Sequence, residues 1–291
     1  MTRKTNNLET PRPFLKWVGG KGQLLNELLA RVDAAGDFGR YHEPFMGGAA
    51  LFYAMQRTKR LKKKAYLADY NPRLVATYEG VQQNVEALIR LLKMHKKKHA
   101  EPYYYQVREA LRDDVASGGP RNLVQHAARI IYLNKTGFNG LYRENNQGLY
   151  NVPIGSYTNP AICDEDNLRA CAKALKKANV QATHFATIIE RVEKGDLVYF
   201  DPPYDPVSKT ASFTSYAKGG FGEDSQRLLA QTCKDLHAKG VKVLLSNSYT
   251  EFIRDLYNID GFKIEAVSAN RNINSNAKKR GAIQEALVRN F

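Results

Sequence analysis

Cysteine is scarce in this chain of 291 residues, and long apolar runs are missing. The three cysteines, Cys163, Cys171 and Cys233, form no C-x-x-C pair and are too few for a disulfide framework, so we expect a reducing, cytoplasmic compartment. No apolar run reaches the roughly 18 residues that span a bilayer. Residues 1–10 are polar, lack the apolar segment of a secretory signal, and are expected to be disordered. These absences predict a protein without a membrane partner.

Acidic residues are also in the minority, with 29 Asp and Glu against 44 Lys and Arg, which leaves a net charge of +15. Such an excess creates a positive potential that favours polyanionic partners, chiefly nucleic acid. The runs at 62–64, 96–98 and 271–280 are as consistent with solvated surfaces as with phosphate contacts. Charge therefore indicates a partner class but identifies no binding surface.

The order of apolar and glycine-rich segments predicts an α/β fold. Strands are expected at 41–45, 65–68, 197–200, 241–246 and 283–289, with helices near 24–36, 49–55 and 225–238. Between them, residues 74–133 have helical spacing, residues 134–160 are rich in turn formers and suggest a hairpin, and a helix is expected at 167–177. We therefore predict a Rossmann-like, doubly wound sheet, formed by 11–75 and 180–291, into which a mainly helical domain, 76–179, is inserted.

The most specific motif is Asp201-Pro202-Pro203-Tyr204, which directly follows the apolar strand 197–200. Open α/β sheets bind ligands at the carboxyl ends of their strands. The prolines fix the backbone and remove two N–H groups, so a carboxylate, an aimed carbonyl and an aromatic ring come together. That set suits a planar base with an amino group. A strand end followed by a simple turn is the structural alternative.

Three further segments fall beside predicted strands. Residues 43–48, Glu-Pro-Phe-Met-Gly-Gly, would let a nucleoside approach the backbone, although the full G-x-G-x-x-G spacing is missing. Asp69 ends the next strand, where it could accept from ribose hydroxyls or, alternatively, cap the following helix. Residues 14–21, Phe-Leu-Lys-Trp-Val-Gly-Gly-Lys, do not form a Walker A loop, but Lys21 could hold a carboxylate of a bound methionine moiety.

The ordered set FLKWVGGK, EPFMGG, LADYNP and FDPPY resembles the D12 class of adenine-N6 DNA methyltransferases, the Dam type, in the motif order of the alpha group. The resemblance covers roughly residues 11–291. It implies S-adenosylmethionine as the cofactor, S-adenosylhomocysteine as its product, no metal, and double-stranded DNA as the partner of a monomer associated with the nucleoid. It also makes 11–75 with 180–291 the catalytic domain and 76–179 the target-recognition domain.

The resemblance also implies a role for each matching residue. Asp201, Pro202, Pro203 and Tyr204 would be catalytic. Cofactor contacts would come from Trp17, Lys21, Phe45, Gly47, Asp69, His184, Phe185 and Asp201. DNA contacts would come from Phe138, Asn139, Leu141, Arg143, Asn145 and Pro153, with Phe138 and Leu141 at the displaced base and Arg143 reading a guanine. The Dam branch targets GATC, and we extend that target to this chain.

The mechanism expected from these residues is direct methyl transfer to the N6 amine of an adenine that has been flipped out of the duplex. Asp201 and the Pro202 carbonyl would accept the two N–H groups, and Tyr204 would stack on the base. A zinc deaminase is disfavoured because the chain has no C-x-x-C. A cytosine-N4 or RNA adenine methyltransferase stays open as an alternative, as does a non-catalytic nucleic-acid-binding protein that retains the fold.

Overall fold

A computed structural model describes residues 10–17, 19–206, 221–270 and 282–291 of the chain. The chain divides into two compact units. The first takes in the chain up to Gly20, Gly47–Lys62 and Asn71–Ala182, and the second takes in Lys21–Met46, Lys63–Tyr70 and the chain from Thr183 onward. Residues 271–280, and all of 1–10 except Thr10, lie outside the described residues, so the expectations for both segments are untested.

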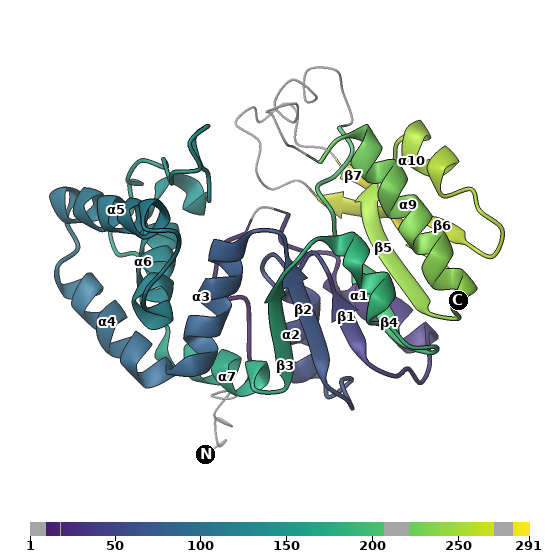
Figure 1. Cartoon of the computed structure of the whole chain (residues 1–291), viewed down its shortest axis with the longest axis horizontal. Helices are drawn as coiled ribbons and strands as arrows, with labels where there is room; N and C mark the ends of the chain where they lie inside the picture. Colours follow the sequence, from purple (N-terminus) through teal and green to yellow (C-terminus); the bar gives the residue numbers. More distant parts are fainter. Residues whose placement is uncertain (1–9, 18, 207–220, 271–281) are drawn as a thin grey trace, which may run out of the picture. The chain divides into compact units, whose positions relative to one another are not determined.

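The described residues of the second unit form six strands: β1 (Tyr41–Glu43), β2 (Ala65–Asp69), β4 (Leu197–Phe200), β5 (Lys242–Ser248), β6 (Lys263–Asn270) and β7 (Ala282–Arg289). Their order is β2-β1-β4-β5-β7-β6 (Figure 1). β2, β1, β4 and β5 run parallel, whereas β7 is antiparallel to both β5 and β6. The expected α/β class with a Rossmann-like parallel sheet is confirmed.

The strand order reverses beside β1, and this reversal places two sequence motifs next to each other. β1 pairs with β2 on one side and with β4 on the other, with Tyr41 opposite Leu197 and His42 opposite Val198. Ligands of open α/β sheets bind at such a switch point, outside the carboxyl ends of the strands. The segments after Glu43 and after Phe200 both leave the sheet at this point.

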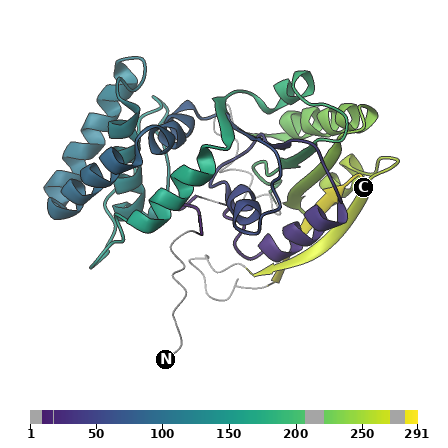
Figure 2. The ribbon, with the colours of Figure 1, turned by 90° about the horizontal axis from the view of Figure 1, so that it is seen from below.

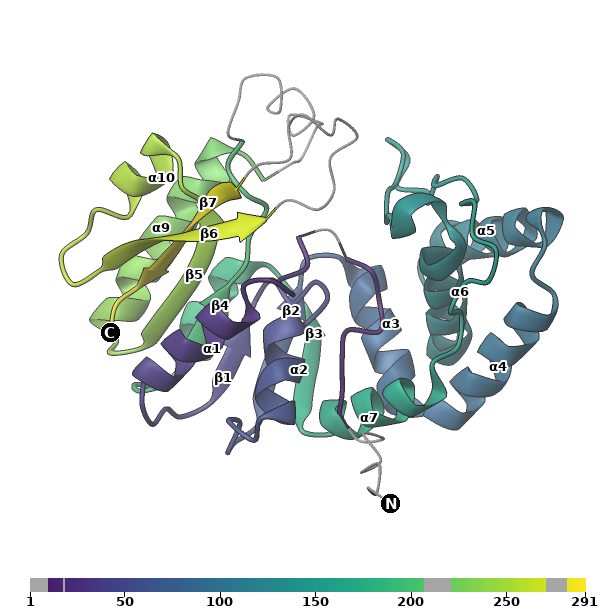
Figure 3. The ribbon, with the colours of Figure 1, turned by 180° about the vertical axis from the view of Figure 1, so that it is seen from behind.

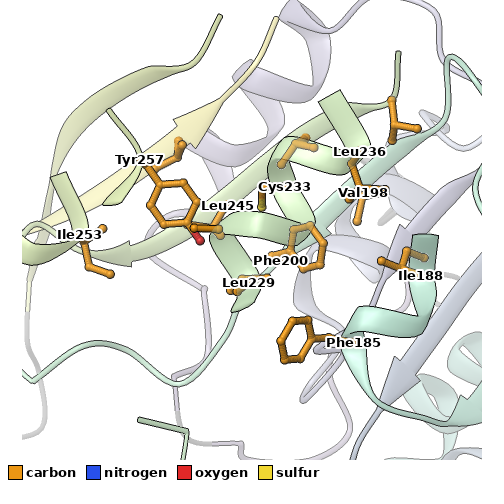
Figure 4. Close-up of a cluster of buried hydrophobic side chains, with 14 of the residues drawn as sticks. Phe185, Ile188, Val198, Phe200, Leu229, Cys233, Leu236, Leu245, Ile253 and Tyr257 are labelled. Carbon is orange, nitrogen blue, oxygen red and sulfur yellow. The ribbon is translucent and has the colours of Figure 1, made fainter. Parts of the chain in front are cut away.

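Helices cover both faces of the second unit's strands. Figures 1 and 3 show α1 (Leu25–Ala34) and α9 (Glu223–Ala238) on opposite faces. In Figure 2, α1 lies beside the C-terminal strands, and the Nε atom of Arg31 donates to Glu265 of β6 at 3.1 Å. On the other face, α9, α10 (Glu251–Leu256) and η2 (Phe185–Glu190) bury an apolar cluster against β4 and β5 (Figure 4). Val198 and Phe200 of β4 belong to this cluster, so burial on this face stabilises the strand that leads to Asp201.

The first unit is mainly helical. It comprises α2 (Ala50–Arg57), α3 (Pro72–Gln83), α4 (Val85–Lys97), α5 (Glu101–Ala116), α6 (Leu123–Thr136), α7 (Glu165–Leu175), the short η1 (Phe138–Gly140) and β3 (Ala178–Ala182). α6 is buried over most of its length and packs against α3, α4 and α5. Gly80 allows α3 to approach closely, because a Cβ atom there would lie 2.3 Å from the carbonyl oxygen of Leu123.

Element boundaries differ from the expected ones in ways that local chemistry explains. The strand expected at 41–45 ends at Glu43, where Pro44 has no N–H to donate to a neighbouring strand. The side chain of Asn71 accepts from the backbone N–H groups of Arg73 and Leu74 and caps α3, with Pro72 in its first turn. Asn71, and not Asp69, is therefore the cap of this helix.

The segment 137–160 is a loop with hairpin-like pairing. Two isolated antiparallel bridges join Gly137 to Ile154 and Glu144 to Tyr150, and neither extends into a strand among the described residues. The turn between them is closed by Asn145, whose side-chain oxygen accepts from the N–H groups of Gln147 and Leu149. Glycines, prolines and such side-chain bonds supply the turn but leave few residues for a ladder.

Candidate active site

Asp201 is the first residue after β4 and is the centre of the polar contacts at this strand end. Its Oδ1 atom accepts from the Nζ of Lys21 at 2.8 Å and from the Oγ of Ser246 at 2.9 Å. Burial raises the pKa of the Asp201 carboxyl, whereas Lys21 and Ser246 act to lower it. Oδ2 accepts no hydrogen bond from any described residue. Within the described part of the chain, Oδ1 thus accepts both of these hydrogen bonds and Oδ2 accepts none.

Tyr204 lies beside the same lysine. The Nζ atom of Lys21 is 4.4 Å from the centroid of the Tyr204 ring, and the Tyr204 hydroxyl donates to Glu285 of β7 at 2.6 Å. An amine of this chain therefore donates to Asp201 while it lies over the face of Tyr204. An N–H donor against an aromatic face is the arrangement expected for the amino group of a bound base.

The backbone of the tetrapeptide is held from α9 and β5. The Nε2 atom of Gln226 donates to the Pro203 carbonyl at 3.0 Å. Asn247 donates to the side-chain oxygen of Gln226 and accepts from the N–H of Asp205, each at 3.0 Å. The Pro202 carbonyl accepts no hydrogen bond from the described part of the chain. It is the carbonyl that the sequence assigns to the target amine.

Aromatic side chains gather next to the tetrapeptide in the second unit. Phe45, just after β1, stacks on Phe185 with centroids 5.2 Å apart, and Phe185 lies 4.4 Å from His184. Asp69 ends β2, and its carbonyl accepts from the N–H of Thr183 at 3.1 Å. The structure thus brings Phe45, His184 and Phe185 together. The hydrogen bond from Thr183 joins the backbone at Asp69 to the residue that directly precedes His184.

Trp17 and Gly47, both expected to contact the cofactor, meet each other in the first unit. Gly47 has a φ of +44°, and a Cβ atom there would lie 2.9 Å from the Cδ1 of Trp17. The carbonyl of Gly47 accepts from the hydroxyl of Tyr78 at 2.9 Å. The indole of Trp17 also lies 5.2 Å from the ring of Tyr142, in the hairpin-like loop. Glycine at position 47 is therefore required by Trp17 itself, whatever else it contacts.

The six residues expected to contact DNA all lie in or beside the hairpin-like loop of the first unit. Phe138, half exposed, donates its N–H to the Pro153 carbonyl at 2.9 Å, which places these two residues side by side. Asn139 is exposed and has a φ of +54°. Leu141 is partly buried, and its carbonyl accepts from Tyr150 at 3.3 Å.

Arg143 is the exposed cation of this group. Its Nε donates to the Oδ1 of Asn151 at 2.8 Å, and its Nη2 donates to the carbonyl of the same residue at 3.3 Å. The guanidinium is thus oriented from within the loop. Asn145 has a structural role in the loop, because its side-chain oxygen accepts the two backbone hydrogen bonds that close the turn.

Several buried polar residues around Asp201 are not among the predicted site residues. Ser246 and Asn247 are fully buried at the end of β5, and Gln226 on α9 is 2% exposed. A sequence signal exists for Ser246 and Asn247, because the polar run 246–248 interrupts an apolar strand at its carboxyl end, where open α/β sheets bind ligands. Gln226 and Glu285 carry no comparable signal, because their contacts depend on helix and strand packing.

The described residues contain no group of three or more His, Cys, Asp or Glu side chains that could hold a metal ion. None of the helices in the described part of the chain is long and apolar enough to cross a membrane.

Comparison with known proteins identifies the class. The family described as D12 class N6 adenine-specific DNA methyltransferase matches residues 17–273. The chain therefore belongs to this family of enzymes, and the expected resemblance is confirmed.

Individual relatives span nearly the whole chain. The type II methyltransferase M.MjaIII of Methanocaldococcus jannaschii is 40% identical, over 96% of this chain and 99% of its own length. M1.LlaDCHI, a type II methyltransferase of Lactococcus lactis subsp. cremoris, is 36% identical over 96% and 95%. The DNA adenine methylase of Haemophilus influenzae is 34% identical over 95% and 93%.

Proposed function

We propose that this chain transfers a methyl group from S-adenosylmethionine to N6 of an adenine flipped out of double-stranded DNA, within the sequence GATC. The observation that carries the proposal is the contact set of Lys21, whose amine donates to Asp201 at 2.8 Å and lies 4.4 Å from the centre of the Tyr204 ring. A primary amine already occupies the position that we assign to the amino group of the target base.

Asp201 and the Pro202 carbonyl are the two acceptors for the target amine. The lone pair of an aromatic amine is delocalised into the ring, so the amine is a weak nucleophile. Hydrogen bonds from both of its N–H groups favour a localised lone pair on the nitrogen. Asp201 need not act as a strong base beforehand, because the nitrogen becomes acidic once it is alkylated. The contribution of the chain is mainly positioning of the amine.

S-adenosylmethionine supplies a methyl group on a positively charged sulfur. The residues present fit such a cofactor. Phe45 and Phe185 form a stacked aromatic pair where the sheet order reverses, which suits the face of an adenine ring. Asp69, at the end of β2, provides a carboxylate for ribose hydroxyls. Trp17, Gly47 and His184 are the further contacts that we assign, and Lys21 must leave Asp201 before the base binds there.

DNA recognition is assigned to the hairpin-like loop. Phe138 supplies a half-exposed aromatic ring, and Arg143 supplies a guanidinium held in position by Asn151. Extrusion of the adenine costs a few kcal/mol, which contacts to the displaced base and its partner strand must offset. The target GATC and the division into a catalytic domain and a recognition domain at 76–179 rest on family resemblance.

The test uses labelled S-adenosylmethionine, unmethylated genomic DNA and the full chain. The DNA is digested to nucleosides, and the modified sites are mapped by sequencing. We expect label in N6-methyladenine at GATC. N6-methyladenine at another sequence would support the proposed reaction but refute GATC as its target. Label in cytosine, or in RNA controls alone, would refute the proposed function.

A matched variant tests the assignment of Asp201. Asp201→Asn keeps the shape of the side chain but removes the charge and one acceptor. We expect transfer to fall by about 1,000-fold or more, as for a group that contacts the reacting atoms, while affinity for DNA, measured by fluorescence anisotropy, stays close to that of the unmodified protein. An unchanged rate of transfer would contradict the assignment.

A further inference from the structure

A buried hydroxyl of β5 lies level with the catalytic carboxylate. β4 and β5 are parallel, and Phe200 pairs with Leu245. The next residue of each segment, Asp201 after β4 and Ser246 in β5, therefore lies at the same level just beyond the last pair. Ser246 is fully buried, and its Oγ lies 2.9 Å from the Oδ1 of Asp201. A buried hydroxyl this close to a carboxylate can donate only one hydrogen bond, so its direction is determined by its neighbours.

The neighbour on the other side is Tyr199, whose hydroxyl lies 2.9 Å from the Oγ of Ser246 and is itself buried. An ionised carboxylate can only accept, so Ser246 gives its single proton to Asp201. Its Oγ must then accept from Tyr199. The three side chains form one chain of hydrogen bonds with a single direction, from Tyr199 through Ser246 to Asp201.

This chain of bonds determines which oxygen of Asp201 is filled. Ser246 and Lys21 both donate to Oδ1, at 2.9 and 2.8 Å. Lys21 comes from the segment before α1 and is the contact that the base replaces under the proposed function. Ser246 belongs to the buried sheet and keeps its place when Lys21 leaves. It is therefore the donor that continues to hold Oδ1 during the reaction.

We propose that Ser246, oriented by Tyr199, is a positioning residue that holds Oδ1 of Asp201 and so presents Oδ2 to the N6 amine of the target adenine. The proposal rests on the proposed function, since it assumes that Asp201 accepts from the target amine. It goes beyond the four sequence motifs, because Ser246 lies in none of them. It predicts that loss of this hydroxyl impairs transfer and spares binding.

The charged and polar groups around Asp201 give the proposal a pH dependence. Burial raises the pKa of the Asp201 carboxyl. Hydrogen bonds from Lys21 and Ser246 lower this pKa, and the negative charge of Glu285 raises it. Transfer requires the ionised form, so activity is lost as the pH falls through this pKa. Removal of the Ser246 donor raises the pKa further, and the acid limb of the pH–rate profile must move to higher pH.

The experiment measures single-turnover methyl transfer on a duplex that carries the site mapped for the unmodified enzyme. For Ser246→Ala we expect transfer to slow by about 10- to 100-fold, as for the loss of a hydrogen bond to a charged group. The dissociation constants for DNA and S-adenosylmethionine should change less than about twofold, and the acid limb should shift upward. Ser246→Thr restores a hydroxyl and should recover most of the rate and the original pH profile.

Two further variants separate positioning from general damage to the fold. Tyr199→Phe should slow transfer less than Ser246→Ala, and the double variant should be no slower than Ser246→Ala, because Tyr199 acts only through Ser246. Thr232→Ala is the matched control. It removes another buried hydroxyl, which donates to the Leu228 carbonyl within α9, and it should leave transfer and its pH profile unchanged.

The outcomes distinguish this inference from the proposed function. If Asp201→Asn is inactive but Ser246→Ala has the original rate and pH profile, the role of Ser246 is refuted and the proposed function stands. An equal loss in Thr232→Ala, or weaker cofactor binding with unchanged transfer in Ser246→Ala, also refutes it. If the unmodified enzyme transfers no methyl group to adenine, the proposed function fails. If Asp201→Asn stays fully active, the assignment of Asp201 fails, and the role of Ser246 fails with it.

Discussion

Arg143 illustrates how a side chain assigned to base recognition is already oriented within its own loop. Two of its nitrogen atoms donate to Asn151, at 2.8 and 3.3 Å, so less side-chain freedom has to be lost when DNA binds. A guanidinium reads the O6 and N7 atoms of guanine through two parallel hydrogen bonds. If Arg143 has this role, its contribution must appear at one base pair of the site and nowhere else.

We therefore expect Arg143→Ala to relax discrimination at a single base pair by about 1–3 kcal/mol while cofactor affinity is retained. This discrimination is measured by competition between the mapped site and duplexes that each carry a substitution at one of its base pairs. Arg121→Ala, which removes an exposed arginine of the same unit, is the control and should lower DNA affinity evenly, if at all. A loss of cofactor affinity with unchanged discrimination would contradict the placement of the recognition loop.

Individual roles could be predicted from the sequence only where a residue lies beside a motif. Asp201 and Asp69 were expected at strand ends and lie there. The ion pair between Lys21 and Asp201 joins residues far apart in the chain, and no local pattern indicates it. Lys21 was expected to contact the cofactor, and that assignment stays a prediction beside the observed contact. Ser246 lies in a polar run that interrupts an apolar strand, but its bond to Asp201, the residue after β4, depends on strand pairing that local sequence does not indicate.

Among the elements, the contact between α3 and α6 depends on one small residue. At Gly80, a Cβ atom would lie 2.3 Å from the Leu123 carbonyl oxygen and 2.7 Å from the Cβ of Ala127. Alanine gains about 1 kcal/mol over glycine in a helix interior, but overpacking costs about 1–3 kcal/mol and more when backbone must move. Steric conflict should therefore dominate helix propensity at this position.

The expected result for Gly80→Ala is a lower free energy of unfolding, measured by urea denaturation. Gln83→Ala is the control, because Gln83 is exposed at the end of the same helix and its replacement should change stability by less than about 0.5 kcal/mol. Higher stability in Gly80→Ala would show that α3 and α6 can separate at little cost and that the close contact does not constrain this unit.

Element types were more predictable than their ends. The strand 197–200 was expected with the observed bounds, because four consecutive apolar residues between turn formers leave little choice. The strand at 41–45 was overextended, since Pro44 stops the pairing. The hairpin expected within 134–160 is reduced to two isolated bridges, because side-chain bonds and glycines shape that loop more than strand pairing does.

For the molecule as a whole, sequence patterns were sufficient for the α/β class and the motifs for the enzyme family, whereas the compact units of the chain do not follow the predicted domain limits. The compact first unit contains α2 and the glycines after Met46 together with the helical region, so its limits differ from the single insertion at 76–179 that the sequence suggests. Contacts such as that between Trp17 and Gly47 create this grouping. They depend on shape, which composition and spacing do not encode.

The net charge of +15 makes its own prediction at this scale. Each phosphate that a protein neutralises adds about −0.9 to the slope of log affinity against log salt, so six contacts lower affinity for duplex DNA about 1,000-fold between 50 and 200 mM salt. We expect a slope of about −5, measured by anisotropy with a duplex that lacks the target site. Binding of S-adenosylmethionine, followed by calorimetry, should depend only weakly on salt and is the control. A flat response for DNA would mean that the excess charge serves solubility, and that affinity comes from the loop at Arg143 and the site at Asp201.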